Sequence, residues 1–77
     1  MFVEIKVFVF DTMYDTMHGE SKVIINTDNI VSISADEVDE GVMEFNITMP
    51  DAIYEVSEDT FFALRKLIKD KFGITRL

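Results

Sequence analysis

The sequence contains no cysteine, a single histidine, one proline and three glycines in 77 residues. The lack of cysteine excludes disulfides and thiolate metal sites, and His18 alone cannot build a zinc site. A chain of this length forms one domain at most, and such a domain buries only roughly 60% of the surface that its unfolded chain exposes. Its stability therefore depends on a well-made core, on a partner, or on both.

Long hydrophobic runs are missing as well. No apolar stretch approaches the about 20 residues that a membrane-spanning helix needs. Glu4 and Lys6 interrupt the apolar residues at the start of the chain, and neither a basic leader nor a small-residue cleavage site is present, so we do not expect a signal peptide. The lack of cysteine fits a reducing compartment, and together these features predict a cytoplasmic protein.

Basic residues are scarce, with seven lysines and arginines against fifteen acidic residues and a formal net charge of −8. A domain this acidic is repelled by phosphate backbones and by anionic membranes, which disfavours direct binding to nucleic acid or to a membrane surface. A protein with a basic surface is the electrostatically favoured partner. The alternative is that the charge only confers solubility.

The most regular feature of the sequence is the alternation of residues with period two. Between residues 2 and 10, β-branched residues occupy every second position, which predicts a strand with Val3, Ile5, Val7 and Val9 on its core face. Further alternating or β-branched segments follow, separated by polar turns. The predicted strands cover residues 2–10, 21–25, 29–35, 42–49 and 52–56.

A helix is predicted over residues 58–72. Ser57 is a good N-cap, acidic residues occupy the first turn and lysines the last, and Gly73 is placed as a C-cap. Apolar residues recur at helical spacing and form one stripe that must be buried. The stripe consists of Phe61, Leu64, Leu67, Ile68 and Phe72.

Short connections between these elements predict hairpins. We therefore expect a single α+β domain over residues 1–77, an antiparallel four- to five-stranded meander sheet packed by one C-terminal helix. Phe61 and Leu64 should be buried against Val3, Ile5, Phe45 and Ile47. Residues 11–20 break the alternation, and the sequence leaves open whether they form a loop, a helical turn or an extension of a strand.

The segments Lys22–Ile33, Ile47–Met49 and Tyr54–Glu58, followed by a short leucine-bearing helix, resemble the FlbD-type family of small flagellar and swarming-motility proteins. The same features are similar to short bacteriophage proteins. The sequence departs from the family pattern at residues 11–20, which are inserted, and at Pro50-Asp51-Ala52, where the family tends to have a glycine-containing turn. The resemblance implies a small non-catalytic accessory protein in the cytoplasm of a bacterial cell or a phage-infected host. It implies no catalytic residue and no cofactor.

Clustered carboxylates form the first candidate site. Asp36, Glu37, Asp39, Glu40 and Glu44 offer the oxygen ligands that calcium prefers, but their spacing matches no known calcium loop. The same residues are candidates for binding a basic partner, or they form a solvated hairpin tip.

Two polar segments have structural alternatives to a functional role. His18 lies near Asp15 and Glu20 in the sequence, but catalysis would also need a nucleophile, an orienting partner and a cleft, none of which the spacing indicates. The turn at residues 26–29 is rich in asparagine and aspartate, which tight turns favour on their own account. We therefore predict no catalytic, metal or cofactor site.

The second candidate site is an excess of aromatic and methionine residues in the N-terminal half. Such surface marks protein interfaces, and a symmetric homodimer or a larger homo-oligomer would bury it. The alternative is that the segment folds over the second face of the sheet and completes the core. The residues concerned are Phe8, Phe10, Met13, Tyr14 and Met17.

These observations favour a small acidic, non-catalytic interaction module that binds and regulates or inhibits a basic protein partner. The alternative is a self-associating structural or assembly protein, as the family resemblance implies. Nothing in the sequence supplies the constellation of side chains that an enzyme requires.

Overall fold

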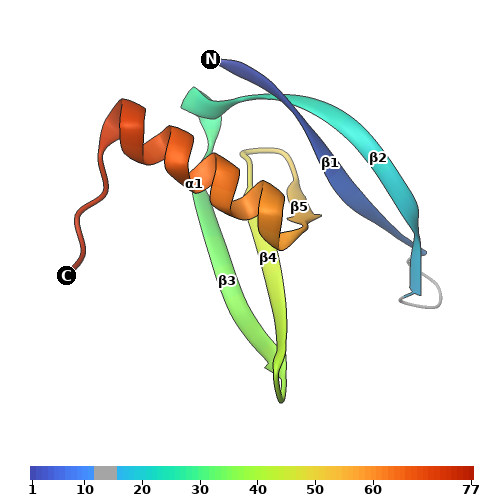
Figure 1. Cartoon of the computed structure of the whole chain (residues 1–77). Coiled ribbons are helices and arrows are strands. Elements are labelled where there is room, and N and C mark those ends of the chain that lie inside the picture. Colours follow the sequence, from blue (N-terminus) through green and yellow to red (C-terminus); the bar gives the residue numbers. More distant parts are fainter. Residues whose placement is uncertain (12–15) are drawn as a thin grey trace.

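Five strands and one helix follow each other along the chain in the computed structural model, which describes the backbone of residues 1–11 and 16–77 and the side chains of residues 1–9 and 19–77 (Figure 1). A short 3-10 helix, η1, separates the first two strands from the last three. The elements are β1 (Phe2–Asp11), β2 (Thr16–Asn26), η1 (Thr27–Asn29), β3 (Ser32–Asp39), β4 (Val42–Thr48), β5 (Ile53–Val56) and α1 (Glu58–Phe72).

The α+β class is confirmed, but the prediction of one meander sheet is wrong. The strands form two antiparallel sheets, a hairpin of β1 and β2 and a three-stranded sheet in the order β3-β4-β5. The predicted tight turn at residues 26–29 is instead a 3-10 helix, capped by Asn26, whose side chain accepts a hydrogen bond from the Asp28 backbone N–H. Thr27 donates its backbone N–H to the carbonyl of Met1 at 2.8 Å, so the start of η1 stays joined to the start of the chain next to the β1–β2 pairing.

The core lies where the two sheets and the helix meet. Both sheets direct their apolar face toward this interior. The core therefore receives side chains from two sheets and a helix, which a single sheet with one helix could not provide. Its buried members are Ile5, Val7, Ile25, Ile47, Met49, Val56, Phe61 and Leu64. The predicted burial of Phe61 and Leu64 is therefore confirmed, with Val3 and Phe45 packed at the edge of the cluster.

The helix bounds agree with the prediction at both ends. Ser57 Oγ accepts a hydrogen bond from the Thr60 backbone N–H at 3.2 Å, as an N-cap does. Gly73 has a φ of +77° and donates its N–H to the Lys69 carbonyl at 2.9 Å, a conformation that glycine adopts without strain. Burial along the predicted stripe is uneven, since Phe72 is exposed at the C-terminal end.

Both hairpins extend beyond the packed centre of the molecule (Figure 1). The radius of gyration is 13.0 Å, against about 11.5 Å for a compact chain of this length. The distal halves of the β1–β2 and β3–β4 hairpins thus project, and Val9, predicted on the core face, is 39% exposed in the part of β1 beyond the core. For residues 11–20 the sequence leaves a loop, a helical turn and a strand extension open; Asp11 ends β1 and residues 16–20 belong to β2, with a register shift between Val9 and Phe10.

Candidate functional site

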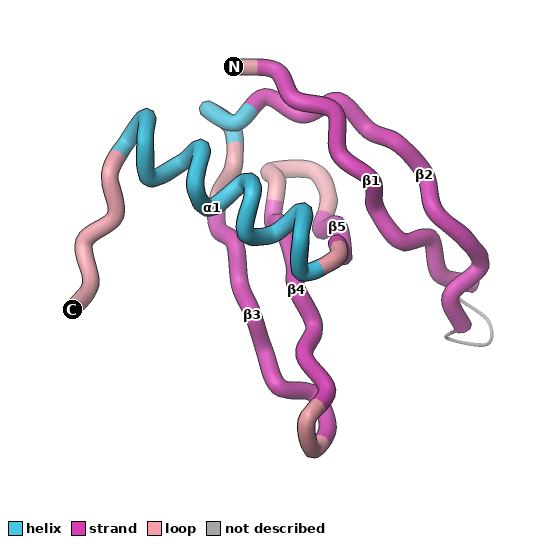
Figure 2. The backbone as a smooth tube through the Cα atoms, in the orientation of Figure 1, coloured by secondary structure: helices cyan, strands magenta, loops and turns pink. Residues whose placement is uncertain are grey.

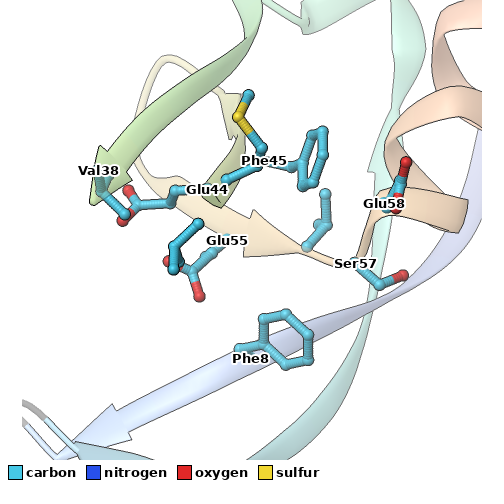
Figure 3. A pocket seen from close by; sticks show the side chains of 10 residues that line it. Phe8, Val38, Glu44, Phe45, Glu55, Ser57 and Glu58 are labelled. Carbon is cyan, nitrogen blue, oxygen red and sulfur yellow. The ribbon is translucent and has the colours of Figure 1, made fainter. Parts of the chain in front are cut away.

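A groove of about 400 Å³ lies between the distal part of β1, the β3–β4 hairpin and the start of α1 (Figure 3). It forms because β1 belongs to one sheet, β4 and β5 to the other, and the two diverge beyond the core. No single element could make it, since each wall comes from a different part of the chain. Its lining residues are Phe8, Val38, Val42, Met43, Glu44, Phe45, Glu55, Val56, Ser57 and Glu58.

The inner end of the groove is apolar and firmly held. Val56 is 2% exposed, and Phe45 stacks on Phe61 of the helix with ring centroids 5.0 Å apart. Phe62 extends this aromatic contact, 5.3 Å from Phe61. Phe8, half-buried on β1, lies across the groove from Ser57 (Figure 3). These contacts join the inner end of the groove to the core, so its shape follows from the packing of the centre.

The outer wall is apolar but uncovered. Val38, Val42 and Met43 are 56%, 51% and 46% exposed on the projecting β3–β4 hairpin. Contiguous exposed apolar surface of this kind is typical of sites where a protein binds another molecule. The Met43 side chain is also unbranched and adapts to differently shaped partners.

Among the residues whose side chains the structure describes, every charged one that lines the groove is acidic. Glu44 and Glu55 lie on the β4–β5 sheet and Glu58 in the first turn of the helix. Asn46 Nδ2 donates a hydrogen bond to Glu44 Oε1 at 2.9 Å and fixes that carboxylate beside the apolar wall. The groove therefore combines an apolar interior with a negative potential, a combination that favours a ligand with both apolar and cationic groups.

Of the four other predicted acidic residues, three lie in the last part of β3, which continues past the predicted end at residue 35, and Glu40 lies in the turn to β4. Two of the four hold the turn together. Glu37 Oε1 accepts a hydrogen bond from the Gly41 N–H at 3.0 Å, and Asp39 Oδ1 accepts one from the Glu40 N–H at 2.8 Å. Their first role is thus structural, whereas Asp36 and Glu40 have no such bond to a turn N–H.

Asp36 lies directly opposite Glu44 in the antiparallel register of β3 and β4. Two like charges at such a cross-strand pair destabilise the sheet, by an amount of the order of 0.2–1 kcal/mol. A cation placed between or beside them would remove this cost. The pair therefore adds an energetic reason for the groove to bind a basic group.

The predicted aromatic and methionine interface can be followed only in part. Phe8 lines the groove, which is a different location from a flat seam on the first strand. Phe10 and Met17 are paired across β1 and β2, but their side chains lie outside the described residues, as do Met13 and Tyr14 entirely. The dimer seam stays a prediction.

Several groove residues were not singled out by the sequence patterns. Val38 and Val42 are isolated valines before and after Asp39-Glu40-Gly41. In the sequence, Glu55 and Glu58 are not distinguished from ordinary surface charges. A usable signal was the presence of Val38 within the run of carboxylates and of Val42 just after it, since a purely solvated tip does not need them. Phe45 was assigned to the core and serves both the core and the groove.

The other sites considered in the sequence are a metal site, His18 and the turn at residues 26–29. Among residues 1–9 and 19–77, whose side chains the structure describes, no group of three potential ligands could hold a metal ion. The His18 side chain lies outside the described residues. In the 26–29 turn, Thr27 is buried and donates its Oγ1 hydrogen to the Met1 carbonyl, while Asp28 accepts a hydrogen bond from Lys71 Nζ at 2.7 Å.

The Asp28–Lys71 contact links η1 to the C-terminal turn of the helix. The hydrogen bond lowers the pKa of Asp28 below its ordinary value and raises the pKa of Lys71 above its own. A second hollow of about 330 Å³ adjoins this pair, between η1, β3 and Phe72. Among its described lining residues the one carboxylate is Asp28, which is paired with Lys71, so they lack the charge of the groove.

No helix in the described part of the chain has the length and apolar character needed to cross a membrane. No protein-family model matches the chain, and no curated protein or solved structure is significantly similar to it. The resemblance to the FlbD-type family accordingly stays a prediction.

Proposed function

We propose that this chain is a small non-catalytic interaction module that binds a basic, partly apolar segment of a protein partner in the groove. The observation that carries the proposal is the lining itself: an apolar interior continuous with the core, whose charged residues Glu44, Glu55 and Glu58 are all acidic. By occupying such a segment the module would regulate or inhibit its partner in the cytoplasm.

Two physical arguments support a protein segment as the ligand. The apolar wall of Val38, Val42 and Met43 would gain from contact with apolar side chains, at about 25 cal/mol for each Å² of apolar surface removed from water. The carboxylates would attract lysine or arginine and repel phosphate, so a nucleic acid meets the wrong charge. A peptide with alternating basic and apolar residues satisfies both walls at once.

The first test uses a fluorescein-labelled peptide of lysine and leucine in amphipathic order, with a glutamate–leucine peptide as control. We expect the protein to raise the anisotropy of the basic peptide only, and the affinity to fall as salt rises. Glu44→Gln combined with Glu58→Gln should weaken binding by about tenfold, as the loss of two exposed charge pairs would.

The matched control is Asp51→Asn combined with Asp70→Asn, which removes two charges outside the groove lining. It should change the affinity by no more than the general loss of net charge does. Equal weakening by both double variants, or equal binding of the acidic peptide, would disprove a specific groove. In NMR spectra of the amide groups, the largest shifts on adding the basic peptide should fall on Phe8, Val42 and Phe45.

The tip of the hairpin is expected to act on the association rate. Asp36→Lys combined with Glu40→Lys spares the two carboxylates that hold the turn, Glu37 and Asp39. In stopped-flow experiments this variant should slow association more than it speeds dissociation, because charges at the rim mainly steer the encounter. An unchanged association rate would restrict the role of these charges to solubility.

A further inference from the structure

The charges of this chain are separated along the sequence. Fourteen of the fifteen acidic residues lie within residues 1–59, whereas five of the seven basic residues lie within residues 65–77. The domain is therefore an acidic body with a basic C-terminal end, although its net charge of −8 conceals this.

The basic end is also apolar and exposed. Beyond α1, residues 73–77 leave the body as an irregular tail (Figure 2). Phe72 is 57% exposed, and Ile74 and Leu77 are exposed as well. Residues 69–77, here called the C-terminal segment, combine lysine and arginine with three uncovered apolar side chains.

A segment with both basic and apolar side chains matches the groove, which has an apolar wall and carboxylates. We infer that the C-terminal segment of one copy docks in the groove of a second copy, with Ile74 and Leu77 against the valine wall and Arg76 toward the carboxylates. The inference rests on the proposed function, since it names an occupant for the same site. Lys71 is left out of the docking contact because it already binds Asp28 of its own chain.

The geometry requires a second copy. The groove adjoins the N-terminal end of α1, where Ser57 and Glu58 line it, and the tail leaves from the opposite end of the helix (Figure 1). A helix of 15 residues is about 22 Å long, whereas the five residues 73–77 span at most about 17 Å when fully extended. The segment therefore cannot reach back into the groove of its own chain.

Such a contact is heterologous: one surface of the first copy meets a different surface of the second. A pair formed in this way still has a free groove at one end and a free tail at the other. Further copies therefore add as the protein concentration rises, unless the rotation between successive copies closes a ring. Because self-assembly and partner binding use the same groove, each is expected to compete with the other.

Complementation of two variants tests the inference. The groove variant carries Val42→Lys and Glu44→Lys and keeps its tail; the tail variant carries Ile74→Ser and Arg76→Glu and keeps its groove. In analytical ultracentrifugation, we expect the mean mass of the wild type to rise with concentration and to fall with added salt. Each variant alone should be a monomer, and their equimolar mixture should form dimers that grow no further.

Asp51→Lys, which changes the net charge by the same amount as Glu44→Lys, should assemble like the wild type. Circular dichroism confirms that each variant is folded before it is compared. Three results would overturn the inference: a wild type that stays monomeric, a tail variant that assembles normally, or a mixture of the two variants that stays monomeric. If only substitutions of Phe8 and Phe10 abolish assembly, the symmetric seam is the contact instead.

The lysine–leucine peptide separates this inference from the proposed function. If the peptide binds the wild type but the wild type does not self-assemble, the tail is not the occupant and the groove still binds basic segments. If neither occurs, both proposals fail. If both occur, adding the peptide should dissolve the assemblies, and a failure to do so would place the contact elsewhere.

Discussion

The strand β4 passes through two different surroundings within seven residues. Its second half lies in the centre of the molecule, where Ile47 is fully buried and Met49, just after the strand, is 9% exposed. Its first half belongs to the projecting hairpin, where Met43, on the same face of the strand, is 46% exposed. The alternation of apolar residues is the same in both halves, so the pattern determines which face a side chain occupies but not whether anything covers that face.

The contrast extends to the whole molecule. In the centre, two sheets and a helix supply three sources of apolar side chains to one core. Beyond it, each hairpin has only its own two strands, and an isolated hairpin buries too little surface to be stable alone. The distal parts are thus available for binding because the centre holds them in place. The following predictions test this division, from the largest expected effect to the smallest.

Leu64 and Val42 provide the most direct test. Leu64→Ala removes a side chain that is 2% exposed at the centre and should lower the free energy of unfolding by about 2–5 kcal/mol. Val42→Ala, in the projecting hairpin, should change it by no more than about 0.5 kcal/mol. Urea unfolding followed by circular dichroism measures both values. Similar losses in the two variants would mean that the distal hairpin is as tightly packed as the centre.

Gly41 tests whether the hairpin tip unfolds together with the centre. Its φ of +72° is strained for residues with a Cβ atom, so Gly41→Ala should cost about 1–2 kcal/mol. Gly19→Ala, in the other hairpin, meets nothing within 4 Å and should not destabilise. If the full cost of Gly41→Ala appears in global urea unfolding, the tip belongs to one cooperative unit. If hydrogen exchange instead shows the cost only in the tip amides, the tip opens independently.

Ser57 lies at the boundary between the two regions, as helix cap and as groove residue. Ser57→Ala should lower the free energy of unfolding by about 1 kcal/mol, because the N–H of Thr60 loses its partner. Ser57→Asp retains a capping oxygen and should recover most of the loss in thermal melts. If both substitutions are neutral, the start of α1 is held by packing alone.

The smallest effect is expected from the ion pair at the other end of the helix. The pKa of Asp28 is lowered on folding, so the contribution of this carboxylate to stability is present above its ordinary pKa and is lost as the pH falls through the lowered folded value. The pKa of Lys71 is raised, so its contribution is lost only as the pH rises through that raised value.

The difference in melting temperature between wild type and Asp28→Asn should therefore be small and constant from about pH 5 to 9, and should disappear in acid. Asp51→Asn, in the β4–β5 turn, serves as the control. A difference that grows as the pH falls would contradict the assignment of the contact to an ionised Asp28.

The sequence alone was sufficient for features that depend on near neighbours in the chain. The helix bounds, the Ser57 and Gly73 caps and the alternating faces of β1 and β4 follow from local hydrogen bonding and from periods of two and 3.6 residues. For residues 16–20 the sequence left a strand extension open as one of three alternatives, because the alternation stops there, and the pairing with β1 decided it. The candidate site was predicted only in part, through Phe8 and Glu44.

The tertiary structure alone decided how the two hairpins are arranged and what lies between them. Whether the chain at Asn26 returns as a neighbouring strand or turns away depends on the 3-10 turn and on its hydrogen bonds to Met1, which is distant in sequence. The groove lies between the two sheets, and its lining brings together Phe8 of β1 with Phe45 of β4 and Val56 of β5. The sequence determines the charge and hydrophobicity of each wall, but the distance between two walls is set by the packing of side chains far apart along the chain.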